Sequence, residues 1–89
     1  MYKLKVIAKE IEMIAWFKKM DMPIPIKFRF LQGDQRQVVK IDRILQADEE
    51  KLAGNRMYIY RCQSVIKNEE KIYELKYEVD KCRWYLFKI

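Results

Sequence analysis

The chain has 89 residues, of which 51% are hydrophobic and only four are Gly or Pro, so it is long enough for one domain and too apolar to be disordered. It contains no histidine, which excludes catalytic sites built on an imidazole base, and no charge-free run of about 20 residues that could cross a bilayer as a helix. Nineteen Lys and Arg residues against thirteen Asp and Glu residues give a formal charge of +6, which favours encounters with polyanions.

The N-terminal segment admits more than one interpretation. Apolar residues recur at helical spacing over residues 4–15, so a short helix is allowed. Residues 11–17 also have the pattern of a strand that turns at residues 21–23 and pairs with residues 24–31, and we prefer this interpretation. If Met13 is an internal start, residues 1–12 are an extension without structural weight and residues 13–89 are the β core. Charged residues interrupt the segment, so we expect no signal peptide and a cytoplasmic protein.

From residue 24 onward, apolar and polar side chains alternate, which is typical of strands with one buried face. Residues 24–31 form the first of these strands, with Phe28 and Phe30 on one side and Lys27 and Arg29 on the other. Gly33 suits the turn that follows, because glycine adopts positive φ without strain. A second strand is predicted over about residues 37–46, and its alternation slips once near residues 42–43, which we interpret as a β-bulge.

The remaining chain predicts a break and three further strands. Residues 47–55 hold three consecutive acidic residues and a Gly-Asn pair, which indicates a loop with one helical turn. Strands follow over residues 56–66, 71–79 and 82–89, joined by short polar connections. In the strand over residues 71–79, the side chains expected to face inward are Tyr73, Leu75, Tyr77 and Val79.

Short connections between consecutive strands favour a mainly β domain over residues 1–89, with five or six antiparallel strands in a meander. The last strand is apolar on both faces and must be covered on both. A small barrel of the SH3-like or OB-like kind would cover it and also remove exposed edges. A strongly curved open sheet is the alternative.

No motif indicates catalysis, a metal or a cofactor, and we expect none of the three. The acidic clusters at residues 48–50 and 69–70 lie in predicted connections, where solvated carboxylates are common. Two glycines cannot build a glycine-rich phosphate loop. Cys62 and Cys82 are expected to be reduced and buried as small apolar side chains, with a disulfide between them as the alternative.

Basic side chains interleaved with aromatic rings form the pattern that best indicates a ligand. Small β domains bind single-stranded nucleic acid when cations contact phosphates and an exposed ring stacks on a base. The candidate phosphate contacts are Lys27, Arg29, Lys40 and Arg61. Tyr58 or Trp84 is the candidate stacking ring, although a small domain needs most of its rings in the core.

The apolar terminal strand gives a second hypothesis, from another class of function. Its apolar surface exceeds what one small barrel hides, and such a surplus often contacts a partner. The candidate interface residues are Trp84, Leu86, Phe87 and Ile89. This hypothesis describes a protein-interaction or homodimerisation domain whose positive charge serves only solubility.

Several segments together resemble a known group of proteins: PIPIKFRF at residues 23–30, VKID at 39–42, YRC at 60–62, YEL at 73–75 and WYL at 84–86. They are similar to small uncharacterised β domains of Gram-positive bacteria, some of which are encoded beside translesion DNA polymerases of the Y family. The resemblance covers roughly residues 13–89 and brings no catalytic residues with it. It implies a DNA-repair neighbourhood, and we therefore expect a non-enzymatic binding module for nucleic acid or a nucleic-acid enzyme.

Overall fold

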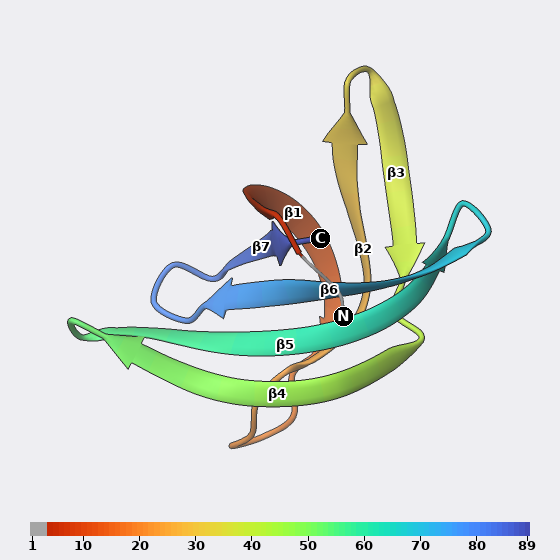
Figure 1. Ribbon diagram of the computed structural model, residues 1–89. Coiled ribbons are helices and arrows are strands. Elements are labelled where there is room, and N and C mark those ends of the chain that lie inside the picture. Colours follow the sequence, from red (N-terminus) through yellow and green to blue (C-terminus); the bar gives the residue numbers. More distant parts are fainter. Residues whose placement is uncertain (1–3) are drawn as a thin grey trace.

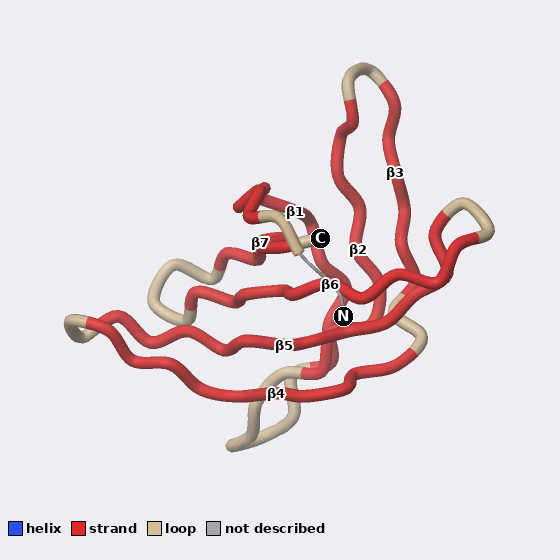
Figure 2. Tube along the Cα trace, in the orientation of Figure 1, coloured by secondary structure: helices blue, strands red, loops and turns tan. Residues whose placement is uncertain are grey.

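A computed structural model describes residues 4–89 and shows seven antiparallel strands in one open sheet, without a helix in that range (Figures 1 and 2). The strands are β1 (Val6–Trp16), β2 (Ile24–Gln32), β3 (Gln35–Lys40), β4 (Arg43–Leu52), β5 (Asn55–Ile66), β6 (Glu69–Glu78) and β7 (Arg83–Lys88). Their order across the sheet is β3-β2-β1-β7-β6-β5-β4. The mainly β class is confirmed, whereas the count of five or six strands and the N-terminal helix are wrong. Within residues 4–89, no helix is long and apolar enough to cross a membrane.

The sheet consists of two meanders that share β1. The first part of β1 pairs with β7, where Ile11 lies opposite Trp84, and the second part pairs with β2, where Met13 lies opposite Phe28. As Figure 1 shows, β2 and β3 run across the direction of β4, β5 and β6. The sheet therefore bends at β1, and side chains from both halves meet in one core that includes Ile11, Phe28 and Leu86.

The two edge strands β3 and β4 do not pair with each other, so the sheet does not close into the expected barrel. The connection between them is nevertheless fastened to β5. The Asp42 backbone N–H donates to the Gln63 carbonyl at 3.0 Å, and the Asp42 carboxylate accepts a 3.0 Å hydrogen bond from the Val65 backbone N–H. These bonds hold the curved sheet in shape where strand pairing is absent.

The N-terminal strand is confirmed and is longer than the predicted residues 11–17. In β1, Ile11 is buried and Met13 and Ala15 pack against the core, while Glu12 and Ile14 are exposed. This alternation has the period of a strand, and pairing with two neighbours stabilises it over a helix. The hypothesis that residues 1–12 carry no structural weight is wrong for residues 6–12, which belong to β1; residues 1–3 lie outside the described part.

The predicted second strand is two strands joined by a corner. Ile41 and Asp42 lie between β3 and β4, and the Ile41 backbone N–H donates to the Ile26 carbonyl at 2.9 Å. The slip in alternation therefore marks the passage of the chain from one edge of the sheet to the other, and not a bulge within one strand. The chain needs this corner because β3 and β4 pair with different neighbours.

The predicted loop over residues 47–55 is wrong, since most of it belongs to β4. Its acidic residues lie on an edge strand, where a charged side chain can remain in solvent. Two of them also have basic partners: Glu49 accepts from Arg56 at 2.9 Å, and Glu50 lies 3.9 Å from Lys76. The turn to β5 is instead made at residues 53–54, where both backbone φ angles are positive, as tight hairpins require.

The later strands and their inward side chains are confirmed. Tyr73, Leu75 and Tyr77 are buried, and Val79 is half-buried against the core. Three buried hydroxyls are satisfied within the protein by two hydrogen bonds. The Ser64 and Tyr73 hydroxyls lie 2.5 Å apart, and the Tyr60 hydroxyl donates to the Pro23 carbonyl at 2.5 Å. The second bond ties the connection between β1 and β2 to the core.

Both cysteines are free thiols. Cys62 is fully buried, as expected, and burial raises the pKa of its thiol from the ordinary 9.0 to about 12. Cys82 is exposed in the turn before β7, so the expectation of two buried cysteines holds for Cys62 alone. The structure therefore has no disulfide between Cys62 and Cys82.

Alkaline pH is expected to destabilise the fold. Burial raises the pKa of the Tyr60 and Tyr73 hydroxyls as well as that of Cys62, so these groups ionise more readily in the unfolded chain. Between about pH 9 and about pH 12 the unfolded state therefore binds fewer protons than the folded state. The free energy of unfolding should be constant from about pH 7 to about pH 9 and fall as the pH rises further, measured by urea denaturation. Equal stability at about pH 8 and about pH 11 would contradict the burial of these groups.

Candidate nucleic-acid interface

The outward-facing side of β1, β2 and β3, here called the basic face, gathers four cations on two adjacent strands. Lys27 and Arg29 lie on β2, and Arg36 and Lys40 lie on β3. The register places Lys27 directly opposite Lys40, and Arg29 opposite Val38. Neither strand contains an acidic residue. The structure thus brings together three of the four predicted phosphate contacts, Lys27, Arg29 and Lys40.

The pair formed by Lys27 and Lys40 is electrostatically unfavourable within the protein. Residues directly opposite in antiparallel strands have Cβ atoms about 5 Å apart, and like charges there destabilise the pair. Within residues 4–89, no carboxylate forms an ion pair with Lys27, Lys40 or Arg36. A bound anion would relieve this repulsion.

Arg29 differs from the other three cations because it has a partner. Its Nε donates to the Glu12 carboxylate on β1 at 2.8 Å, and both side chains are exposed. This hydrogen bond and the charge of Arg29 lower the pKa of Glu12. The Glu12 carboxylate therefore remains ionised near neutral pH and partly offsets the positive charge of the basic face.

Large apolar side chains lie among these cations and are exposed to solvent. Trp16 is 62% exposed at the end of β1, and Ile14, Leu31 and Val38 are each more than half exposed. The Lys18 ammonium lies 5.6 Å from the centre of the Trp16 ring. A surface hollow of about 490 Å³ is lined by residues of all three strands, including Ile14, Lys27, Arg29 and Val38.

Arg61, the fourth predicted phosphate contact, lies on a different surface. It is exposed on β5, opposite Glu74 of β6 and Gln46 of β4. A small hollow of about 110 Å³ there is lined by Arg61 together with the carboxylates of Asp48 and Glu74. These acidic neighbours make this surface a poor site for a phosphate.

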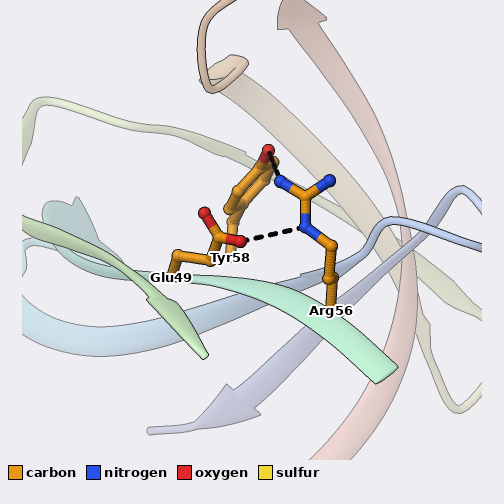
Figure 3. A network of polar contacts seen from close by, with 3 residues as sticks. All are labelled: Glu49, Arg56 and Tyr58. Atoms are coloured by element: carbon orange, nitrogen blue, oxygen red, sulfur yellow. Dashed lines mark hydrogen bonds and ion pairs between the residues drawn. The ribbon is translucent and has the colours of Figure 1, made fainter. Parts of the chain in front are cut away.

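Tyr58, one of the two predicted stacking rings, is already engaged by side chains of the protein. Arg56 donates from Nη2 to the Tyr58 hydroxyl at 3.1 Å and from Nε to Glu49 at 2.9 Å (Figure 3). The ring also stacks on Tyr77, with centroids 6.4 Å apart. Tyr58 is half-buried in this cluster, which leaves little of its ring surface for a base.

Trp84, the other predicted stacking ring, is a core residue. It is 7% exposed and packs against Tyr77, with centroids 4.6 Å apart, and against Tyr60. A ring buried on this scale cannot stack on a ligand without unfolding its surroundings. Trp84 therefore does not fit the role that the sequence suggested.

The predicted interface on the terminal strand does not fit the structure either. Strand β7 lies between β1 and β6, so both of its edges are paired. Leu86 is buried, Ile89 packs against the core, and the Phe87 ring is covered by the Lys76 ammonium at 3.8 Å. The terminal strand is rich in apolar residues because it lies in the middle of the sheet, where its side chains are covered by the protein itself.

Arg36 and Trp16 are the members of the basic face that sequence reasoning missed. Arg36 falls two and four residues before Val38 and Lys40, so alternation would have found it if the strand had been started earlier. Trp16 follows Ile14 with the same spacing on β1. Trp16 could not be placed on this face without the register of β1 against β2, which shifts between Ile14 and Ala15.

Within residues 4–89, no group of three or more His, Cys, Asp or Glu side chains is placed to hold a metal ion. Comparison of the chain with protein-family models, with curated proteins and with solved structures finds no match. The resemblance to small β domains of Gram-positive bacteria therefore stays a prediction, and the function has to be argued from the basic face.

Proposed function

We propose that the protein is a non-enzymatic binding module and that its basic face binds single-stranded nucleic acid. The observation that carries this proposal is the opposed pair of Lys27 and Lys40, flanked by Arg36 and Arg29 on strands without a carboxylate. Phosphates two or three nucleotides apart would lie between these cations, and the attraction of each cation to a phosphate would outweigh the repulsion among the cations. Lysine and arginine at such a site fix the backbone without reading sequence.

The exposed Trp16 ring supports a single-stranded ligand over a duplex. A base can stack on an exposed indole only when it is not already stacked and paired inside a helix. The Lys18 ammonium, 5.6 Å from the ring centre, adds positive charge beside it. The binding mode we propose is thus a backbone that follows β2 and β3 and a base that rests on Trp16.

A dimer that uses the same face is a second candidate function, because Ile14, Trp16, Leu31 and Val38 are exposed there. A two-fold interface would, however, place two copies of the same four cations together. This repulsion favours a polyanionic partner. Sedimentation equilibrium separates the candidates, since a monomer at micromolar concentration rules out the dimer.

Binding of a fluorescently labelled oligothymidylate is expected to weaken steeply with salt. Three unpaired cations, Lys27, Arg36 and Lys40, predict a slope of log K against log salt of about −2, at about −0.7 for each phosphate contact on a single strand. The double variant Lys27→Gln/Lys40→Gln should reduce the slope to about −0.7. Fluorescence anisotropy at several salt concentrations measures both.

The matched control for that experiment is Lys51→Gln/Lys81→Gln, which removes the same charge from exposed positions on β4 and the turn before β7. This control should leave the slope unchanged. An equal effect of the two double variants would show that only net charge matters, and would refute a site on the basic face. Absence of binding at low salt would refute the proposed function as a whole.

Removal of the exposed indole tests the stacking contact. Trp16→Ala is expected to weaken oligothymidylate binding by about five- to 150-fold, which corresponds to the 1 to 3 kcal/mol of a stacked base, while the salt slope stays the same. The fold should tolerate the change because the side chain is 62% exposed. Leu52→Ala, which removes a similarly exposed apolar side chain from β4, is the control and should bind like the wild type. Unchanged affinity of Trp16→Ala would exclude the ring from the site.

Neutralising Glu12 is expected to strengthen binding. Glu12→Gln removes the partner of Arg29 and the negative charge beside the basic face, so Arg29 becomes available for a phosphate. The salt slope should then become steeper by about 0.7, and the affinity at low salt should rise. Weaker binding by Glu12→Gln, measured in the same anisotropy assay, would mean that Arg29 must be oriented by Glu12 and is not an additional phosphate contact.

A further inference from the structure

A second site lies at the end of the molecule where the β2–β3 meander meets the β5–β6 turn. A cavity of about 360 Å³ opens there, between side chains of both halves of the bent sheet. Its lining includes the buried core residues Phe28, Val39 and Leu86. The cavity therefore reaches down to the core, and its volume is within the range of small-molecule sites.

The rest of the lining is apolar or basic, apart from the uncharged polar side chains of Gln32 and Gln37. Further apolar walls are formed by Ile7, Phe30, Ile66 and Ile89. The charged side chains of the lining are Lys9, Lys67 and Lys71, and no acidic side chain belongs to it. The cavity thus combines an apolar interior with ammonium groups, and it is separate from the basic face, to which none of these lysines belongs.

Carboxylates of the protein neutralise little of the positive charge of these three lysines. Lys9 is half-buried, and its Nζ lies 5.2 Å from the centre of the Phe30 ring, while no carboxylate within residues 4–89 forms an ion pair with it or with Lys67. Lys71 reaches Glu69 at 3.6 Å, but both side chains are largely exposed, so this pair is weak. An anion from outside would pair with ammonium groups that the described carboxylates leave largely unpaired.

We propose that this cavity binds an amphipathic carboxylate, with an unbranched acyl chain inside the cavity and its carboxylate at Lys9, Lys67 and Lys71. An inorganic anion would satisfy the ammonium groups but leave the apolar walls in contact with water. A neutral apolar molecule would do the reverse. A carboxylate with an acyl chain matches both parts of the lining.

Calorimetric titration with decanoate tests the proposal, at concentrations at which decanoate does not form micelles. We expect saturable binding of one decanoate per protein. Hexanoate, which lacks four methylenes, should bind at least about tenfold more weakly, because each buried methylene contributes to affinity. Decanol, which has the chain without the charge, should also bind more weakly than decanoate.

Two variants separate the charge from the apolar walls. Lys9→Met keeps an apolar stem beside Phe30 and removes one of the three ammonium groups, so it should reduce the preference for decanoate over decanol. Lys67→Gln/Lys71→Gln should weaken decanoate binding without loss of folding, since both side chains are exposed. Amide resonances in the nuclear magnetic resonance spectrum report whether each variant keeps its fold.

The basic-face variant Lys27→Gln/Lys40→Gln is the matched control, and it should bind decanoate like the wild type even if it no longer binds oligothymidylate. Failure of one proposal is thereby distinguishable from failure of the other. Equal affinity for decanol and decanoate in the wild-type protein would overturn the proposed ligand class. Absence of saturable decanoate binding, or perturbed amides spread evenly over the surface, would overturn the site.

Discussion

The structure depends on β1 forming hydrogen bonds with two different partners along its length. Its first part belongs to the β4–β7 meander and its second part to the β2–β3 meander, so the strand acts as the bend between them. The strands of the described residues form one sheet and no helix covers it, so the sheet buries one face by bending back on itself. The core, the basic face and the cavity at the β5–β6 turn are three consequences of this bend.

The bend also explains why the outward-facing side chains divide into regions of different charge. Strands β2 and β3 lack acidic residues, whereas β4 carries Asp48, Glu49 and Glu50 at the opposite edge. Because β1 separates the two meanders, the cations of β2 and β3 have few carboxylates within reach apart from Glu12. Strands β2 and β3 in this way carry four cations and no carboxylate, which makes the potential of this face positive.

Much of the fold follows from alternation, and the failures occur where alternation carries no information. The strands over residues 24–31, 56–66 and 71–79 were predictable because one face of each is buried. Strand β4 was not, because it lies at an edge with nearly all side chains exposed, so its acidic run has the pattern of a loop. Lys27, Arg29 and Lys40 could be placed on one face from their spacing, whereas Trp16 required the register of β1 against β2, which shifts between Ile14 and Ala15. The burial of Trp84 required the position of β7 in the middle of the sheet, which depends on a contact between the two ends of the chain.

Cross-strand nuclear Overhauser effects in the isotope-labelled free protein test the bend and the register together. The account predicts contacts of β1 with both neighbours in one molecule, from Ile11 to Trp84 and from Met13 to Phe28, and a contact between Lys27 and Lys40 across β2 and β3. Contacts of β1 with only one of these strands would remove the bend. A contact of Lys27 with Val39 in place of Lys40 would shift the register by one residue, turn the cations toward the core and contradict the account of the basic face.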